Sequence, residues 1–162
     1  MNIVVTGVAP RCGTSAMMRL LLTSGWNPHA VVEQFPRYVA PSENPKGFWD
    51  VSDDYRTGAT DIALNENECI KLWFPMFKHM DWTTVDLLVV MHRQDVIKQR
   101  ASILRCAKAE RLALTVKQSA QMFVEANKNI NELSDLVKQL KIPMRYLRGS
   151  PNSVLHKIKE II

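Results

Sequence analysis

The stretch NIVVTGVAPRCGTSAMMRL, residues 2–20, joins an apolar run to a helical pattern through a loop that contains glycine. The run that opens it is short and rich in valine and isoleucine, which predicts a buried strand. Gly7 and Gly13 bracket the turn that follows, and Thr14 and Ser15 stand where a helix begins. Backbone N–H groups in such a loop bind anions, helped by the positive N-terminal end of the helix. The stretch therefore predicts a strand, an anion-binding loop and a helix.

The rest of the chain alternates short apolar runs with helical patterns. The apolar runs, which predict strands, are 2–6, 69–74, 86–91 and 144–147. Helices are expected at about 15–24, 95–111, 115–140 and from 151 to the C-terminus. Strands separated by helices form a parallel sheet that is covered on both faces. We therefore expect one α/β domain over 1–162, with the irregular, proline-rich segment 27–50 as a substrate-side loop.

Composition favours a local anion site over a nucleic-acid surface. The formal net charge is +5 over 162 residues, without a long run of Lys and Arg, although surplus surface lysine explains the charge equally well. The three cysteines, Cys12, Cys69 and Cys106, lack metal-ligand spacing, which suits a reducing cytosol. No apolar stretch approaches the roughly 20 residues that span a bilayer. The sequence thus predicts a soluble, cytoplasmic, unprocessed protein that binds neither nucleic acid nor membrane.

The loop differs from that of an ATP- or GTP-hydrolysing protein. A Walker A loop reads GxxxxGK[ST], with the lysine on the β- and γ-phosphates. Here Thr14 stands in place of the lysine, and the spacing from Gly7 to Gly13 is one residue longer. Arg11, two residues before the second glycine, supplies a cation instead. The alternative interpretation is a structural turn followed by a Thr/Ser helix cap.

A second cationic position follows another predicted strand. In LLVVMHRQDVIKQRAS, residues 87–102, His92 and Arg93 stand at the carboxyl end of the strand, the edge where open α/β sheets bind ligands. A Mg-dependent P-loop NTPase commonly places an Asp there. An arginine favours a second anionic group over metal-assisted hydrolysis. The alternative is a solvated arginine at a helix start.

These motifs are similar to those of one family. PRCGTS at 10–15 resembles the PRSGT[ST] loop of sulfotransferases that use 3′-phosphoadenosine 5′-phosphosulfate, with Cys12 for the usual serine and Ala9 as an extra residue. NPKGFWD at 44–50 resembles an NPKG(Y/F)(F/W)E segment of bacterial sulfotransferase-like proteins. MRYLRGSPNSVLHKIKEII at 144–162 is similar to their last strand and C-terminal helix. The resemblance implies a three-layer P-loop NTPase-like fold with a central parallel sheet of about four to five strands flanked by helices.

The resemblance also implies how the sulfate donor is held. The strand-end arginine, Arg93, and Ser102 correspond to the family's ligands of the 3′-phosphate, at a spacing of nine where many members show eight, and His92 could share the role. No metal is required. The residues that correspond to the ligands of the 5′-phosphosulfate end are Pro10, Arg11, Cys12, Gly13, Thr14 and Ser15.

Catalysis needs charge stabilisation on the leaving phosphate and a general base. Arg11 is the candidate for the first task, and Lys71 could assist at the sulfuryl group, although it could equally be a snorkelling surface lysine. Cytosolic members carry their base in a KxHxP-like segment, and here Trp73 takes the histidine's place in KLWFP. Other branches use a glutamate after the first helix, so Glu33 is the first candidate for the base. The next candidates for the base are Glu43, Asp50 and His29.

Three functions follow from this reasoning. The first is a sulfotransferase that binds 3′-phosphoadenosine 5′-phosphosulfate and transfers the sulfuryl group to a hydroxyl or amine of an unknown small-molecule, saccharide or peptide acceptor. The second is a non-catalytic nucleotide-binding or interaction protein on the same scaffold, which the short chain favours. The third is a P-loop kinase, which the missing lysine and the strand-end arginine disfavour.

Overall fold

One all-parallel sheet forms the centre of the molecule. In a computed structural model, described for residues 1–8, 12–29, 62–95, 97–99, 101–102 and 116–161, the strands are β1 (Ile3–Gly7), β2 (Asn27–Pro28), β3 (Glu68–Lys71), β4 (Leu87–His92) and β5 (Lys138–Pro143). Their spatial order is β2-β3-β1-β4-β5, and each pairing is parallel. The first strand of the chain thus lies at the centre, between two strands that follow much later.

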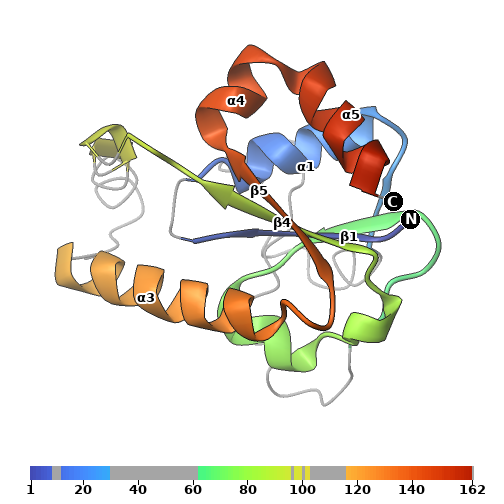
Figure 1. Ribbon diagram of the computed structural model, residues 1–162, viewed down its shortest axis with the longest axis horizontal. Helices are drawn as coiled ribbons and strands as arrows, with labels where there is room; N and C mark the ends of the chain where they lie inside the picture. The colour runs from blue at the N-terminus through green and yellow to red at the C-terminus, as the bar shows by residue number, and fades with distance from the viewer. Residues whose placement is uncertain (9–11, 30–61, 96, 100, 103–115, 162) are drawn as a thin grey trace.

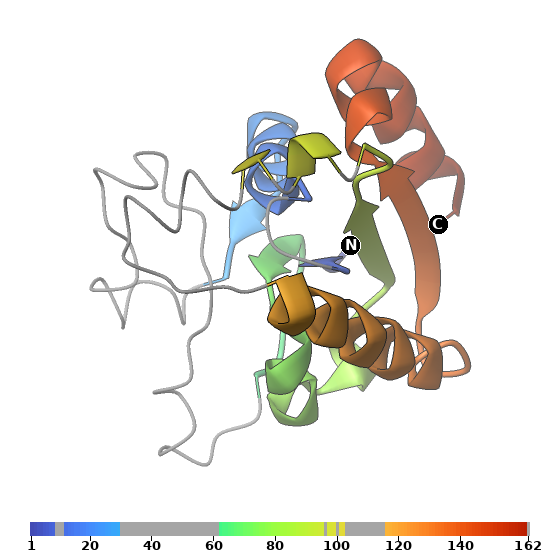
Figure 2. The same cartoon turned by 90° about the vertical axis from the view of Figure 1, so that its left-hand side faces the viewer.

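Helices cover both faces of the sheet, which gives three layers (Figures 1 and 2). Helices α1 (Thr14–Thr23), α4 (Met144–Gly149) and α5 (Pro151–Ile161) lie on one face. Helix α3 (Val116–Glu132) and the 3₁₀ helix η4 (Phe74–His79) lie on the other, with a second 3₁₀ turn, η5 (Trp82–Thr84), leading into β4. The predicted α/β fold with a parallel sheet flanked by helices is confirmed.

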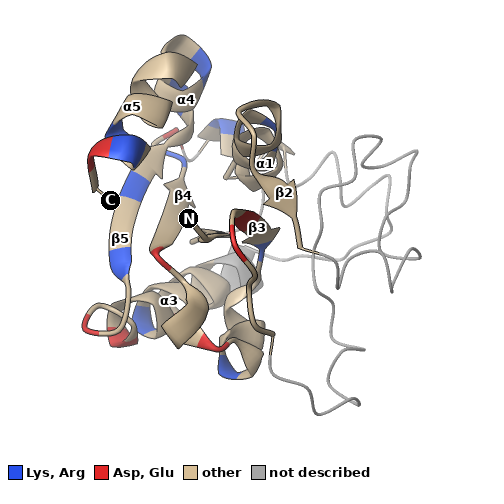
Figure 3. Cartoon of the chain, turned by 90° about the vertical axis from the view of Figure 1, so that its right-hand side faces the viewer, with Lys and Arg blue, Asp and Glu red and all other residues tan. Residues whose placement is uncertain are grey.

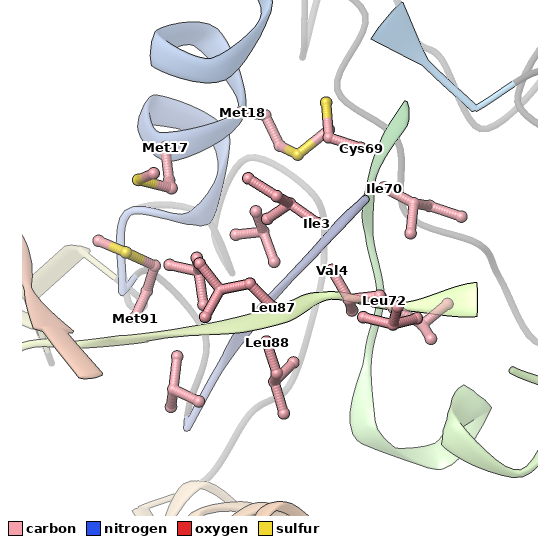
Figure 4. Packing of buried hydrophobic residues seen from close by; sticks show 14 of the residues in the cluster. Ile3, Val4, Met17, Met18, Cys69, Ile70, Leu72, Leu87, Leu88 and Met91 are labelled. Atoms are coloured by element: carbon pink, nitrogen blue, oxygen red, sulfur yellow. The ribbon is translucent and has the colours of Figure 1, made fainter. Parts of the chain in front are cut away.

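The central strands are buried on both sides, which explains their continuous apolar runs. Ile3 and Leu87 are register partners and face α1, where Met17 and Met18 pack against them (Figure 4). Val4, the next residue of β1, faces the opposite side with its own partner Leu88. All of these side chains are fully buried. The site described below is therefore carried by a rigid core.

The prediction for the last strand was wrong. Residues 144–147 form part of helix α4, and the strand is β5, just before them, in a region predicted as the end of a long helix. Helix α3 ends earlier, at Glu132, and a turn follows in which the Leu136 N–H donates to the Leu133 carbonyl. Because β5 is an edge strand, it does not need a continuous apolar run, and Lys138 and Lys141 interrupt its apolar residues Leu140 and Ile142. Its spacing of polar residues therefore resembles that of a helix.

Two further boundaries differ from the prediction. Strand β3 ends at Lys71, and the 3₁₀ helix η4, with Pro75 in its first turn, begins at Phe74 within the run predicted as strand. Strand β2 lies in the segment predicted as an irregular loop and has two residues. The predicted cap at Asp95 is confirmed, since its Oδ1 accepts a hydrogen bond of 2.9 Å from the Lys98 N–H. In the described part of the chain, no helix combines the length and apolar character needed to cross a membrane.

Candidate functional site

The loop after β1 leaves the sheet beside the end of β4. Gly7 is the register partner of Met91, and the Val8 N–H donates to the Met91 carbonyl at 3.2 Å. The chain then enters α1 through Gly13, whose carbonyl accepts from the N–H groups of Ala16 and Met17, each at 3.1 Å. The first turn of α1 contains no acidic residue, and Gly13 provides no side-chain cap. The partial positive charge at this end of the helix is therefore not neutralised by either. The N–H groups of Thr14 and Ser15 therefore form an electropositive helix start.

Gly13 is required at this position by its backbone conformation. Its φ of +97° lies in the left-handed region, which favours glycine. A Cβ on this residue would also lie 2.9 Å from Cγ of Met144, the first residue of α4. The junction of β5 and α4 thus lies close to the loop, and it approaches from the β5 edge of the sheet, on the opposite side of β1 from β3.

Arg93 stands where the sequence predicts it, directly after β4 and partly exposed. The Val8–Met91 hydrogen bond fixes the start of the loop after β1 next to Met91, two residues before this arginine. Asp95 lies nearby, and its pKa is below the ordinary value mainly because the Lys98 N–H donates to the carboxylate, with a smaller contribution from Arg93. The fold therefore brings the loop and the strand-end arginine to one edge of the sheet.

A hydrogen bond ties the loop to the segment after β4. The Gln99 Nε2–H donates to Sγ of Cys12 at 3.5 Å, and Cys12 is 1% exposed. Ser102 follows Gln99 by three residues in helical backbone, so both lie on one side of that turn. Ser102 is buried. The predicted 3′-phosphate pair, Arg93 and Ser102, thus flanks a segment that contacts the loop.

Lys71 is the last residue of β3, which pairs with β1 on the side opposite β4. It is 6% exposed, which is far less than a surface lysine shows, and it lies on the face of the sheet covered by α1 with its register partner Val5. The Leu72 N–H donates to the Val5 carbonyl at 2.9 Å, so β3 stays paired with β1 up to this point. Lys71 therefore lies near the carboxyl end of β3, the same edge of the sheet at which the loop leaves β1.

Several predicted site residues lie outside the described part of the chain, namely Pro10, Arg11, Glu33, Glu43 and Asp50. They stay predictions. His29, the remaining candidate for the base, is described and lies directly after β2, where its Nδ1 is 2.5 Å from Oε2 of Glu68. Glu68 was missed by sequence reasoning, because a pairing across 39 residues leaves no local pattern.

Basic residues gather on the β4–β5 side of the site. Residues 138–159 contain six Lys and Arg and no Asp or Glu, and they follow β5, α4 and α5 (Figure 3). The pKa of His92 is lowered by burial and, to a lesser degree, by the charge of Lys141. Among the described residues, β5, α4 and α5 thus carry an excess of basic side chains, with Glu160 as their one acidic residue, and this excess suits an anionic ligand.

A pocket of about 130 Å³ lies among β5, α4 and α5, with Lys157 4.9 Å above the ring of Tyr146 at its wall. Ligand sites usually measure about 300–1,000 Å³, so this pocket is too small to hold a nucleotide. Among the described residues, no three His, Cys, Asp or Glu side chains are grouped as a metal site requires. Comparison with protein-family models and with curated proteins gives no match.

Proposed function

We propose that the protein binds 3′-phosphoadenosine 5′-phosphosulfate and transfers its sulfuryl group to a hydroxyl or amine of an acceptor. The observation that carries the proposal is the juxtaposition of an acid-free helix start after β1 with Arg93 at the end of the adjacent strand β4. Two phosphates on one nucleotide need two such groups. The resemblance of PRCGTS to the sulfotransferase loop supplies the identity of the nucleotide.

The proposed roles follow the order of the strands. The N–H groups of Thr14 and Ser15, with Arg11, hold the phosphosulfate end and stabilise the charge that develops on the leaving phosphate. Arg93 and Ser102 hold the 3′-phosphate on the β4 side, where the basic residues of β5, α4 and α5 add a favourable field. Lys71 approaches the sulfuryl group from β3. The donor supplies the transferable sulfuryl group, and these residues orient it.

Ligand-dependent thermal stability tests the proposal. Adenosine 3′,5′-bisphosphate at about 100 times its Kd would stabilise the fold by about 2.7 kcal/mol, because ligand bound to the native state adds stability by mass action. Adenosine 5′-monophosphate and ATP with Mg²⁺ should give smaller shifts in Tm. Arg93→Ala should abolish the preference for the bisphosphate, and the matched control is Lys128→Ala, which removes an equal charge from an exposed position of α3 on the other face of the sheet.

Two outcomes decide between the alternatives. A preference for ATP with Mg²⁺ contradicts the proposal and favours a kinase. Selective bisphosphate binding without transfer of labelled sulfuryl from the donor to any acceptor or to water supports a non-catalytic nucleotide-binding protein. Binding together with transfer supports the enzyme.

A further inference from the structure

We propose that the outer edge of strand β5 binds an extended, acidic peptide segment of a partner protein, which adds to the sheet as a further strand. β5 is the last strand in the order of the sheet and, within the described part of the chain, pairs with β4 and with no other strand. Figure 3 shows it at the outer margin of the sheet, on the opposite edge from β2. Binding at this edge requires no nucleotide and goes beyond the function proposed above.

The strand is long enough to hold an added strand. β5 has six residues, Lys138–Pro143, and all of them are in register with β4. Successive residues of a strand direct their N–H and C=O groups to opposite sides, so pairing with β4 leaves every second residue facing away from the sheet. Such an edge accepts an extended peptide through main-chain hydrogen bonds. The other edge strand, β2, has two residues and is too short for this.

A small apolar pocket lies beside this edge. Its volume is about 130 Å³, and it is lined by residues 140–143 of β5, by Tyr146 of α4 and by Val154 and Lys157 of α5. Because four consecutive residues of β5 line the pocket, it follows the backbone of the strand. A cavity of about 150 Å³ holds one benzene-sized group, so this pocket accommodates one apolar side chain. We infer that a side chain of the added strand fills it.

The charges around the edge are positive. Lys138 and Lys141 are exposed on β5, and residues 138–159 contain six Lys and Arg and no Asp or Glu. Alternation along the strand places Lys141 on the face opposite Leu140 and Ile142, which line the pocket. An added strand thus meets the pocket with one set of its side chains and Lys141 with the other set. The matching partner segment alternates apolar and acidic residues.

The same lysines disfavour a second copy of this chain as the occupant. Two copies joined at β5 would place Lys138 and Lys141 of both chains on one short ladder, and like charges across a ladder are destabilising. Lysine on an edge strand commonly prevents such self-pairing. A nucleic acid would use the positive charge, but it has neither a peptide backbone for the strand edge nor an aliphatic side chain for the pocket. An acidic peptide uses all three features.

A synthetic peptide tests the proposal. The probe is a fluorescein-labelled peptide with the six-residue length of β5, in which Glu and Val alternate. Fluorescence anisotropy should show saturable binding that weakens as salt is added, because salt screens exposed charges. A peptide that alternates Lys and Val should not bind. Replacing the central Val by Gly should weaken binding at least about tenfold, because the pocket then stays unfilled.

Backbone methylation of the peptide separates strand pairing from simple attraction between charges. Every second N–H of the bound peptide points towards β5, so methylation of that set should abolish binding, whereas methylation of the alternate set should leave it. Attraction by charge alone predicts equal affinity for the two methylated peptides. The unmodified peptide should also slow amide hydrogen exchange in β5 and leave exchange in β2 unchanged.

Lys141→Glu tests the surface of the protein. The variant replaces attraction by repulsion, so it should bind the Glu–Val peptide about tenfold more weakly than the wild type does. The matched control is Lys78→Glu, which makes the same change of net charge at an exposed position of η4. Circular dichroism and Tm establish that both variants fold.

Contrary results are equally specific. The proposal is overturned if the Glu–Val peptide does not bind, if the two methylated peptides bind equally, or if Lys141→Glu binds as tightly as Lys78→Glu. A short single-stranded oligonucleotide that binds more tightly than the peptide and displaces it would assign the surface to nucleic acid instead. Dimers of the free protein that the peptide dissociates would assign the edge to a second copy. Binding of adenosine 3′,5′-bisphosphate is measured separately, so none of these results alters the test of the proposed function.

Discussion

Gly13, the N-cap residue of helix α1, lies against Met144, the residue that follows strand β5. Strand β4 separates the strands that lead to these two residues, so the contact passes over the end of β4. Arg93 follows that end. The close approach of Gly13 to Met144 therefore brings the loop after β1 against the β5–α4 junction, across the strand that Arg93 follows.

Gly13→Ala should weaken both the fold and bisphosphate binding. Alanine in the left-handed conformation costs about 1–2 kcal/mol, and Met144 must also shift. Gly25→Ala is the matched control, because its φ of +104° imposes the same strain while a Cβ there meets nothing within 4 Å. In denaturant titrations we expect Gly13→Ala to lose more unfolding free energy than Gly25→Ala, because only the first variant displaces Met144, and we expect weaker bisphosphate binding in Gly13→Ala alone. Equal affinities would contradict the role of this glycine in the site.

Lys141→Gln should raise the pKa of His92 part of the way towards 6.5. Burial is the larger cause of the low pKa and persists in the variant, but the repulsion from the ammonium is removed. Because the folded pKa is depressed, the contribution of His92 to stability is full above pH 6.5 and is lost as the pH falls below it. NMR titration and unfolding at several pH values measure both effects. Lys138→Gln, with the same charge change at the start of β5, should leave the pKa of His92 nearly unchanged.

Glu68 should stabilise the fold in a pH-dependent way. Its folded pKa lies below 4.5, so its contribution is present above that pH and is lost as the pH falls through the folded value. The difference in unfolding free energy between the wild type and Glu68→Gln should therefore narrow in acid. Chemical denaturation across this pH range measures the difference. A constant difference would show that the charge of Glu68 does not stabilise the native state.

Cys69 should be inert towards thiol reagents in the native protein. It is fully buried, and burial together with the charge of Glu68 raises the pKa of its thiol to about 12. Since the thiolate is the reactive form, labelling should require unfolding. Peptide mapping after brief treatment with a maleimide, with and without denaturant, tests this. Fast native labelling of Cys69 would mean that β3 opens readily.

The sequence predicts the central elements because their burial is uniform. β1 and β4 are covered on both faces, so they appear as continuous apolar runs, and the glycine pair marks the loop between β1 and α1. The edge strands differ: two lysines interrupt the apolar residues of β5, and β2 has only two residues. Their positions depend on pairing with β4 and β3, which no local pattern encodes.

The residues of the candidate site likewise separate into those that the sequence predicts and those that depend on the pairing of edge strands. Gly13 and Arg93 each follow a strand that the sequence predicts from its apolar run. Because parallel strands end at the same edge of a sheet, the sequence also predicts that both residues lie at that edge. The pairing of His29 with Glu68 depends on β2 lying beside β3, and it became visible with the fold. Arg11 and Glu33 lie outside the described residues and stay predictions.

The central position of β1 has a consequence for synthesis of the chain. The strand is made first, yet its two neighbours begin at Glu68 and Leu87. During synthesis, the edge of β1 that pairs with β4 therefore stays unpaired until more than half of the 162 residues have been made. Such long-range parallel pairing is slow and exposes the nascent chain to aggregation. Chaperone capture of this N-terminal segment is thus expected to limit the yield of folded protein.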